Sequence, residues 1–381
     1  MIVGGGIVGA SIAWHLTDAG CRNVLIVERE SHQGKGSTGK SMGGVRAQFA
    51  TRPNIQMSLY SIPFYAAFDE RLGQPGGYRD QGYLFVATKQ KHLDYLQTNQ
   101  ALQKSLGLNQ ASMISRDDIV AMVPQLRSDD ILGGSFCPTD GFVDPYSVMV
   151  GFTTDACGKG ATIWRSTEVS SIQHNGSGIS GVETSRGPVS TPVVVNAAGA
   201  WAAGVAAMAG VDLPVEPMRR MLIPTEPFAE VSHEIPMVID MTNGFHFRPE
   251  SLGFLLAWND PEEKGGEFNT NFEPSFVEKV LTLAADRVPC FENLAVNPKR
   301  AWAGLYEMSP DHHCIIGPVE RVKGFFCANG FSGHGVMHAP ATGKMLADLI
   351  LHGKTSVVDN VEVLSPGRFA RGELLHETAI L

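Results

Sequence analysis

The sequence predicts an α/β fold, α+β overall, that contains a Rossmann-like dinucleotide-binding domain. Residues 4–9 form a glycine-rich turn between a short apolar run and a run of helical period, which is the order of strand, phosphate-binding turn and helix. A second apolar run at 325–328 leads into another glycine-rich turn at 330–335 and a helical run to about His352. The runs GYLFVAT at 82–88 and GFLLAW at 253–258 predict further strands between these two units.

The first glycine-rich turn is followed by an acid at the spacing that a dinucleotide requires. The helical run stops at Gly20, and the strand-like run VLIVE ends in Glu28, nineteen residues past Gly9. The glycines let the backbone approach a pyrophosphate, the helix N-terminus offers free N–H groups, and the carboxylate accepts hydrogen bonds from ribose hydroxyls. A plain strand-to-helix turn is the alternative.

The segment after this acid is small, polar and glycine-rich: GKGSTGKSMGGVRAQF. Its composition fits a segment that lies along a long cofactor, and an exposed loop is the alternative that composition leaves open. The later turn at 330–335 provides a second helix N-terminus, with Pro340 expected in the first helical turn. Two helix N-termini suit a ligand that gains electrostatic stabilisation from positive helix ends in two places.

The composition is that of an ordinary globular protein. The chain has 381 residues, of which 43% are hydrophobic and 18% charged, and this length is enough for about two or three domains. The formal charge of -9 argues against a nucleic-acid partner, because such affinity rests on clustered Lys and Arg. Six widely spaced cysteines without a C-x-x-C pair are expected to be free thiols in a reducing compartment.

Neither a signal peptide nor a membrane span is expected. The N-terminus lacks a basic first segment. Residues 193–211 carry no charge, but their many Ala and Gly residues favour a buried strand followed by a small-residue helix. We predict a cytoplasmic protein without a transmembrane segment.

Five segments together resemble the D-amino-acid oxidase, glycine oxidase and sarcosine oxidase superfamily of flavoenzymes, in order and at the family's spacing. They are GGGIVGASIAWHL, GSTGKSMGGVRAQF, VVVNAAGAWA, WAGLYEMSPDHHCIIGP and NGFSGHGVMHAPATGK. The similarity covers essentially the whole chain and is greatest to the branch of sarcosine oxidase or dehydrogenase β-type subunits, dimethylglycine dehydrogenase and L-proline dehydrogenase β-type subunits. The resemblance implies bound FAD and oxidation of the C–N bond of a secondary or tertiary amino acid.

The resemblance also implies two domains interleaved along the chain. A Rossmann-like FAD-binding domain would take residues 1–80, 141–214 and 312–381. A substrate-binding domain built on a mainly antiparallel sheet would take residues 81–140 and 215–311. Within the first domain, DPYSVMVGFTTDACGKG predicts a helix capped by Asp144.

The resemblance carries FAD-binding roles to three glycine-rich regions and their neighbours. The first turn would meet the pyrophosphate, Glu28 the ribose and Val169 the adenine, while residues 37–45 would follow the cofactor towards the isoalloxazine ring. Residues 198–201 would support the cofactor, with a strand-to-helix packing turn as the alternative, and residues 333–337 would surround the pyrimidine edge, where the helix N-terminus meets developing negative charge. The full set is Gly4, Gly6, Ile7, Val8, Gly9, Glu28, Arg29, Ser37, Thr38, Gly43, Gly44, Val45, Val169, Ala198, Gly199, Trp201, Gly330, Gly333, His334, Gly335, Val336 and Met337.

Noncovalent FAD is expected, because the family's covalent anchor positions have changed. The histidine anchor falls at Lys40 and the cysteine anchor of monomeric sarcosine oxidases falls at Gly304. Neither residue forms the corresponding covalent link. The pair at 312–313, His-His, has no further ligands at metal spacing, so no metal site is predicted.

The substrate side has lost the family's familiar carboxylate-binding residues. The arginine of glycine and D-amino-acid oxidases falls at Tyr306, and the lysine of monomeric sarcosine oxidases falls at Met337. Arg46 and Arg248 are candidates to bind the substrate carboxylate in their place. Each has another interpretation: Arg46 could hold the flavin, and Arg248 could pair with Glu250 or another carboxylate. The residues expected to line the substrate pocket are Tyr306, His334, Arg46 and His246.

Two classes of function stay open. The first is an amino-acid dehydrogenase or oxidase that passes electrons to a protein, a quinone or oxygen. The lysine that monomeric sarcosine oxidases place over the flavin falls at Leu255, which has no charge to stabilise superoxide and so favours a dehydrogenase. The second is a flavoprotein assembly factor or non-catalytic partner. A partner subunit or a homo-oligomer is compatible with both.

Overall fold

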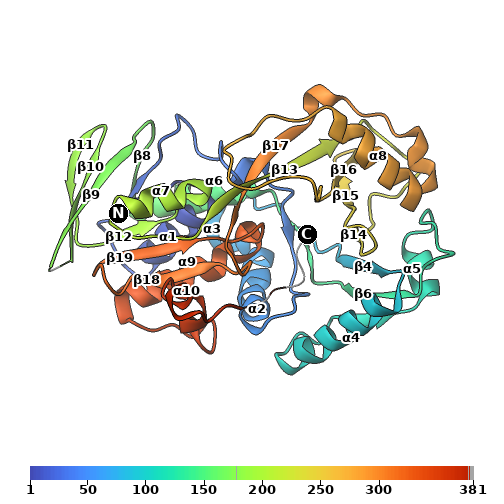
Figure 1. Cartoon of the computed structure of the whole chain (residues 1–381), viewed down its shortest axis with the longest axis horizontal. Helices are drawn as coiled ribbons and strands as arrows, with labels where there is room; N and C mark the ends of the chain where they lie inside the picture. The colour runs from blue at the N-terminus through green and yellow to red at the C-terminus, as the bar shows by residue number, and fades with distance from the viewer. Residues whose placement is uncertain (177, 376, 378–381) are drawn as a thin grey trace.

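The computed structural model describes residues 1–176, 178–375 and 377. One of its two main parts is built on a six-stranded sheet whose strands come from both ends and the middle of the chain (Figure 1). Neighbouring strands run parallel except for the antiparallel pair at one edge. In spatial order the strands are β18 (Ile315–Pro318), β19 (Phe325–Asn329), β12 (Val194–Asn196), β1 (Ile2–Val3), β2 (Leu25–Val27) and β8 (Thr162–Trp164). The predicted α/β fold is confirmed.

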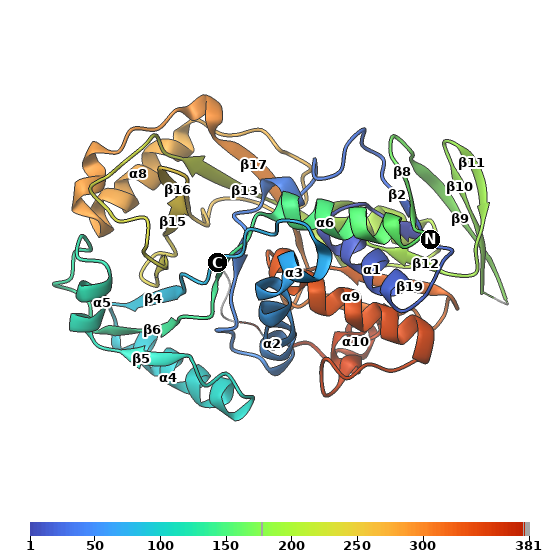
Figure 2. The same cartoon turned by 180° about the vertical axis from the view of Figure 1, so that it is seen from behind.

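Helices cover one face of this sheet and a small antiparallel sheet covers the other. The helices are α1 (Ile7–Asp18), α2 (Arg52–Ala66), α6 (Pro145–Gly158) and α9 (Gly335–His352), and Figure 2 shows α1 lying beside both α6 and α9. The opposite layer contains β9 (Val169–Asn175), β10 (Gly178–Thr184), β11 (Gly187–Ser190) and α7 (Ala202–Ala207). The parallel strands are therefore buried between two layers, as parallel sheets require.

The other main part of the molecule is built on an eight-stranded sheet that is antiparallel except between β14 and β4. Its order is β17 (Trp302–Met308), β13 (Glu216–Pro224), β16 (Gly253–Ala257), β15 (His246–Glu250), β14 (Met237–Asp240), β4 (Tyr83–Ala87), β6 (Gly133–Cys137) and β5 (Ser112–Ile114). Helices α5 (Arg116–Met122) and α8 (Ser275–Arg287) pack on one face, and α4 (Gln90–Ser105) packs on the other.

Short elements complete the described chain. The strands β3 (Gly44–Val45) and β7 (Gly141–Phe142) pair with each other. The remaining helices are α3 (Phe68–Leu72), α10 (Arg368–Arg371), η1 (Thr38–Lys40), η2 (Gly199–Trp201), η3 (Pro289–Asn293), η4 (Pro298–Arg300) and η5 (Val361–Leu364).

Two local predictions, the cap at Asp144 and the strand and helix within 193–211, are confirmed. Asp144 caps α6, since its Oδ1 accepts from the N–H groups of Tyr146 at 2.9 Å and Ser147 at 3.2 Å. The uncharged run at 193–211 contains β12 and the small-residue helix α7. Among the described residues, no helix has both the length and the apolar composition to cross a bilayer.

Pro340 lies one turn further along its helix than predicted. The helix α9 begins at Gly335, so the proline is in its second turn, where it removes the hydrogen bond that Val336 O would accept within the helix. The Tyr65 hydroxyl donates to Val336 O instead, at 2.5 Å. A side chain from α2 thus satisfies the carbonyl that proline leaves unpaired.

Candidate functional site

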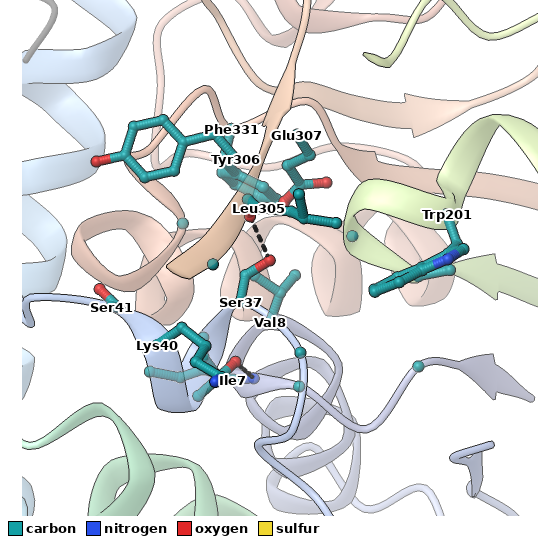
Figure 3. Close-up of a pocket in the computed structure, with 18 of the residues that line it drawn as sticks. Ile7, Val8, Ser37, Lys40, Ser41, Trp201, Leu305, Tyr306, Glu307 and Phe331 are labelled. Atoms are coloured by element: carbon teal, nitrogen blue, oxygen red, sulfur yellow. Dashed lines mark hydrogen bonds between the residues drawn. The ribbon is translucent and has the colours of Figure 1, made fainter. Parts of the chain in front are cut away.

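A cavity with about 370 Å³ of space for water lies between the two sheets (Figure 3). One side comes from the carboxyl ends of β1, β2 and β12 and from the N-terminus of α1. The other side comes from β13, β15, β16 and β17 of the eight-stranded sheet. In a parallel sheet, the space outside the carboxyl ends of the strands is where ligands bind.

The three glycines of the first turn have two different roles, tight packing and access for a ligand. A Cβ on Gly4, whose φ is +108°, would lie 2.3 Å from Ala197 O, and a Cβ on Gly9 would lie 2.0 Å from Gly4 O. These two positions allow the turn and α1 to pack tightly, and Gly9 lies outside the cavity lining. Gly6 does line the cavity, where a Cβ would have one close neighbour, Thr38 Oγ1 at 3.2 Å. A ligand can therefore approach the backbone at Gly6.

Glu28 lines the cavity at the end of β2 and is held by backbone groups. Its Oε2 accepts from Gly5 N at 2.9 Å and its Oε1 accepts from Glu30 N at 2.9 Å. Gln33 Nε2 donates to Gly5 O at 2.7 Å, which fixes the same turn from the other side. The carboxylate thus has one orientation, with lone pairs left for a ligand hydroxyl.

The polar segment around η1 connects the first turn to the eight-stranded sheet. Ile7 N donates to Thr38 Oγ1 at 3.0 Å, and Ser37 Oγ donates to Leu305 O at 2.6 Å (Figure 3). The next three predicted cofactor residues lie outside the cavity lining, in or beside β3. A Cβ on Gly44 would lie 1.8 Å from Tyr83 Oη, so this glycine serves packing. The other two are Gly43 and Val45.

The third predicted segment lines the cavity through Val169, Ala198, Gly199 and Trp201. The guanidinium carbon of Arg29, which also lines the cavity, is 3.8 Å from the centre of the Trp201 ring. The ring lies at the right-hand end of the cavity in Figure 3. An aromatic ring and a cation therefore border the cavity beside Glu28.

The second glycine-rich turn lines the cavity at Gly333, Gly335 and Val336. Gly333 has a φ of +95°, and a Cβ there would lie 2.4 Å from the Tyr306 ring, so both conformation and space require glycine. Gly330 packs against other residues outside the lining. The same is true of Met337, which packs in an apolar cluster.

The cavity brings together two of the four predicted substrate residues. Tyr306 and His246 line it. The His334 ring packs edge-on against Phe49 with a centroid distance of 4.9 Å, outside the lining. Arg46 is fully buried behind the wall, where its Nη1 donates to a backbone carbonyl and its guanidinium carbon is 3.9 Å from the Phe49 ring.

The alternative arginine of the sequence analysis has a structural role. Arg248 Nη1 lies 2.6 Å from Glu250 Oε2, and its Nε donates to Met42 O at 2.8 Å. The predicted ion pair with Glu250 is thus present. These contacts hold the guanidinium away from the cavity lining.

His246 is a neutral hydrogen-bond acceptor. Its Nδ1 lies 2.9 Å from Gly244 O, and since a carbonyl can only accept, Nδ1 carries the proton. Burial lowers the pKa of His246 to about 4. At neutral pH the ring is therefore uncharged and its Nε2 has a free lone pair.

Two ionisable residues of the wall were missed by sequence reasoning. Glu307 Oε2 accepts from Gly330 N at 3.1 Å, and burial raises the pKa of Glu307 to about 8. The carboxyl group is therefore mostly protonated at neutral pH. Arg220 on β13 also lines the cavity. Glu307 could have been found from the sequence, because it follows Tyr306 in the motif WAGLYEMSPDHHCIIGP. Nothing in the sequence distinguishes Arg220 from Arg219.

The positions of the family's covalent anchors meet in the structure. A Cβ on Gly304 would lie 2.6 Å from Lys40 Cβ, and both residues line the cavity. On β16, Leu255 is buried outside the lining, while Ala257, two residues further along the same face, lines it. Both residues on this face lack charge.

Comparison with known proteins supplies a family. The model of the DAO family, described as FAD dependent oxidoreductase, matches residues 1–349. FAD-dependent oxidoreductase domain-containing protein 1 of Xenopus laevis is 31% identical over all of this chain and 84% of its own length. Mitochondrial dimethylglycine dehydrogenase of Rattus norvegicus is 31% identical over 97% of this chain, which spans only 45% of that protein.

Solved structures agree with these sequence matches. The L-proline dehydrogenase of P. horikoshii has a TM-score of 0.91 and 32% identity, and 98% of each chain is covered. The glycine oxidase of Geobacillus kaustophilus has a TM-score of 0.85 and 26% identity over 96% of this chain and 97% of its own.

Proposed function

The chain belongs to the DAO family of FAD-dependent oxidoreductases, and on that premise we propose that it oxidises the C–N bond of a secondary or tertiary amino acid. Proline-, sarcosine- and dimethylglycine-like compounds are the candidate substrates. The observation that carries the proposal is the wall of polar side chains, Tyr306 and His246 among them, that faces the glycine-rich turns across the cavity. The similarity to L-proline dehydrogenase over the full length supports this choice of substrate class.

The residues present fit an FAD. Gly6 and the N-terminus of α1 leave backbone close to the cavity for a pyrophosphate. Glu28 offers oriented lone pairs to a ribose, and the α9 N-terminus at Gly335 borders the cavity where the flavin's pyrimidine edge would lie. When bound, the flavin supplies the acceptor for the two electrons and the hydrogen removed from the carbon beside the substrate nitrogen.

Two uncharged side chains of the wall, His246 and protonated Glu307, bear on how the substrate binds. His246 Nε2 can accept a hydrogen bond from the N–H of a secondary amine and so orient it, whereas a neutral tertiary amine has no N–H to donate, so this contact serves secondary amino acids. A ring with a pKa of about 4 does not keep an ammonium proton, so we propose that the amine loses that proton to water before the reaction. Because Glu307 is protonated at neutral pH, it adds no negative charge that would repel a substrate carboxylate.

A panel of amino acids tests the function. Sarcosine, dimethylglycine, L-proline and hydroxyproline are mixed with the holoprotein without oxygen, and bleaching of the flavin absorbance is followed. Glycine, a primary amine, is the control. Faster bleaching by at least one secondary or tertiary amino acid supports the proposal. Bleaching by glycine alone contradicts it, and bleaching by none with FAD bound favours the assembly-factor alternative.

We also propose that the FAD is noncovalent, because neither Lys40 nor Gly304 provides the family's anchor chemistry and a larger residue at 304 would collide with Lys40. Acid precipitation of the holoprotein is expected to leave the yellow colour in the supernatant. Absorbance of the two fractions near the flavin maximum measures this. A yellow pellet means a covalent link.

The domain division and the cellular location belong to the same proposal. The strands of the six-stranded sheet fall within 1–80, 141–214 and 312–381, and those of the eight-stranded sheet fall within 81–140 and 215–311, which supports two interleaved domains. We keep the predicted cytoplasmic location, although the dimethylglycine dehydrogenase relative is mitochondrial by name. Fractionation of cells that produce the protein decides this point.

A further inference from the structure

Arg220 places a cation in the cavity wall. The strand β13 carries two neighbouring arginines, and successive side chains of a strand point to opposite faces of the sheet. Arg220 lines the cavity, while Arg219 borders a different surface hollow. Nη1 of Arg220 donates to Arg219 O at 3.0 Å, and its buried Nε has no hydrogen-bond partner among the residues that the structure describes. Its donors are thus largely unused.

The two acids whose charges act on Arg220 form their contacts with other residues. Glu263 accepts two hydrogen bonds from Arg219, from Nε at 3.0 Å and from Nη2 at 2.9 Å. Asp260 lies 2.9 Å from Lys279 Nζ. Within the described part of the chain, no carboxylate lies within ion-pair distance of the Arg220 guanidinium. A partly buried cation without a carboxylate partner is costly unless an anion enters from outside.

The guanidinium is held in place by an aromatic ring. The Arg220 guanidinium carbon lies 5.3 Å from the centre of the Tyr306 ring, and a Cβ on Gly333 would come within 2.4 Å of the same ring. Tyr306 therefore contacts both the arginine and the second glycine-rich turn. Packing fixes a planar group with parallel N–H donors, which matches a carboxylate in two hydrogen bonds.

We propose that Arg220 binds the carboxylate of the substrate and makes the cavity selective for amino acids over amines that lack a carboxylate. This inference rests on the proposed function, since it names the residue that recognises the acid group of that substrate class. Arg220 takes the carboxylate-binding role that the sequence analysis gave to Arg46 or Arg248, whose guanidinium groups lie outside the cavity lining. Three other cations line the cavity: Arg29, Lys35 and Lys40. Arg29 packs on the Trp201 ring and Lys35 Nζ lies 3.7 Å from Glu30 Oε2, so Lys40 is the rival that we test.

Ligand binding without turnover tests the proposal. Pyrrole-2-carboxylate and its neutral carboxamide are titrated into the holoprotein by calorimetry, together with acetate and benzoate. Arg220→Met is expected to raise the Kd of the tightest carboxylate roughly 10- to 100-fold, the usual value of hydrogen bonds to a charged group, while leaving carboxamide binding nearly unchanged. Arg220→Lys keeps the positive charge but loses the paired N–H donors of the guanidinium, so its Kd for the carboxylate is expected to lie between those of the wild type and Arg220→Met.

Two matched variants serve as controls. Arg219→Met removes the neighbouring arginine on the opposite face, and Lys40→Met removes the rival cation; neither is expected to abolish carboxylate selectivity. Unchanged carboxylate binding in Arg220→Met overturns the proposal, and so does loss of selectivity in Lys40→Met alone. Failure of every carboxylate to bind the wild-type protein overturns it as well. Loss of FAD from Arg220→Met, read from the absorbance ratio, also overturns it, because the arginine would then hold the cofactor.

The two proposals fail separately. If no amino acid bleaches the flavin but carboxylates bind and lose affinity in Arg220→Met, the proposed reaction is wrong and the binding assignment stands. If amino acids bleach the flavin and Arg220→Met binds carboxylates normally, the assignment alone is wrong. In turnover, the assignment also predicts that Arg220→Met raises KM for the amino acid more than it lowers kcat.

Discussion

At the scale of single residues, the structure repeatedly satisfies one polar group with a side chain from another element. Pro340 leaves Val336 O without its helical partner, and Tyr65 on α2 supplies the missing donor. Glu307 is half-buried in the cavity wall, with a backbone N–H as its partner and with its pKa raised to about 8. Both cases make a measurable prediction.

Tyr65→Phe is expected to lower the free energy of unfolding by about 1–3 kcal/mol, because it leaves a buried carbonyl unsatisfied while keeping the ring. Chemical denaturation of the holoprotein measures the difference. Tyr60→Phe, on the same helix and at a partly buried position, is the matched control. Equal stability of the Tyr65→Phe variant and the wild type would show that another group satisfies Val336 O.

Glu307 makes stability depend on pH. Its folded pKa of about 8 is above the ordinary value, so the native state keeps a proton that the unfolded state loses. The stabilisation is fully present below about pH 4.5 and is lost as pH rises through about 8, with a limit of about 5 kcal/mol. Glu307→Gln resembles the protonated acid and is expected to melt at a temperature that falls less between pH 5 and pH 9.

The control for this pH effect is Glu278→Gln, an exposed glutamate on α8. It is expected to keep the wild-type fall in melting temperature. If Glu307→Gln shows the same fall as the wild type, the Glu307 carboxyl group is ionised in the native state and does not carry the pH dependence.

At the scale of elements, two helices from opposite ends of the chain form one unit at the cavity. The helices α1 and α9 cross so closely that a Cβ on Gly343 would lie 2.3 Å from Ser11 Oγ, and Ser11 Oγ donates to Ala339 O at 2.7 Å. Both helices present their N-termini to the cavity. One ligand can therefore use both positive helix ends, as the two glycine-rich turns predict.

The β1–α1–β2 unit carries its own prediction. Glu28→Ala is expected to raise the Kd for FAD roughly tenfold, because it removes the proposed ribose acceptor and the acceptor that holds Gly5 N. Titration of the apoprotein with FAD, followed by flavin fluorescence, measures it. Glu30→Ala, two residues away and with the same charge, is the control. An unchanged Kd in Glu28→Ala would place the ribose elsewhere.

At the scale of the whole molecule, the junction of the two sheets decides which side chains surround the cavity. The six-stranded sheet contributes the turns that fit the cofactor, and the eight-stranded sheet contributes Arg220, His246 and Tyr306. Residue 257 on β16, at the cavity wall, is alanine. This position bears on the electron acceptor.

We expect slow reaction of the reduced flavin with oxygen, as in a dehydrogenase, since β16 offers no positive charge to developing superoxide. Reduced holoprotein is mixed with air-saturated buffer and the return of the oxidised spectrum is timed. Ala257→Lys is expected to raise the rate constant roughly tenfold or more, whereas Leu255→Lys, outside the lining, tests the position that the family alignment suggested. Rapid return with stoichiometric peroxide in the wild type would make the protein an oxidase, and Lys40→Met would then test that cation.

The sequence by itself determined the fold class, a dinucleotide-binding turn and most local elements, because these depend on short-range features, whereas FAD as the cofactor came from the resemblance to a family. Glycine spacing, the acid at Glu28 and the cap at Asp144 act within a few residues or one strand-turn-helix unit. Only the tertiary structure decided which polar side chains face the cavity. The sequence analysis favoured Arg46 and Arg248 and passed over Arg220. In the structure, packing against Phe49 and pairing with Glu250 turn the first two away, and strand alternation turns Arg220 inward. The orientation of a side chain depends on neighbours that are distant in the chain, so the local sequence pattern does not predict it.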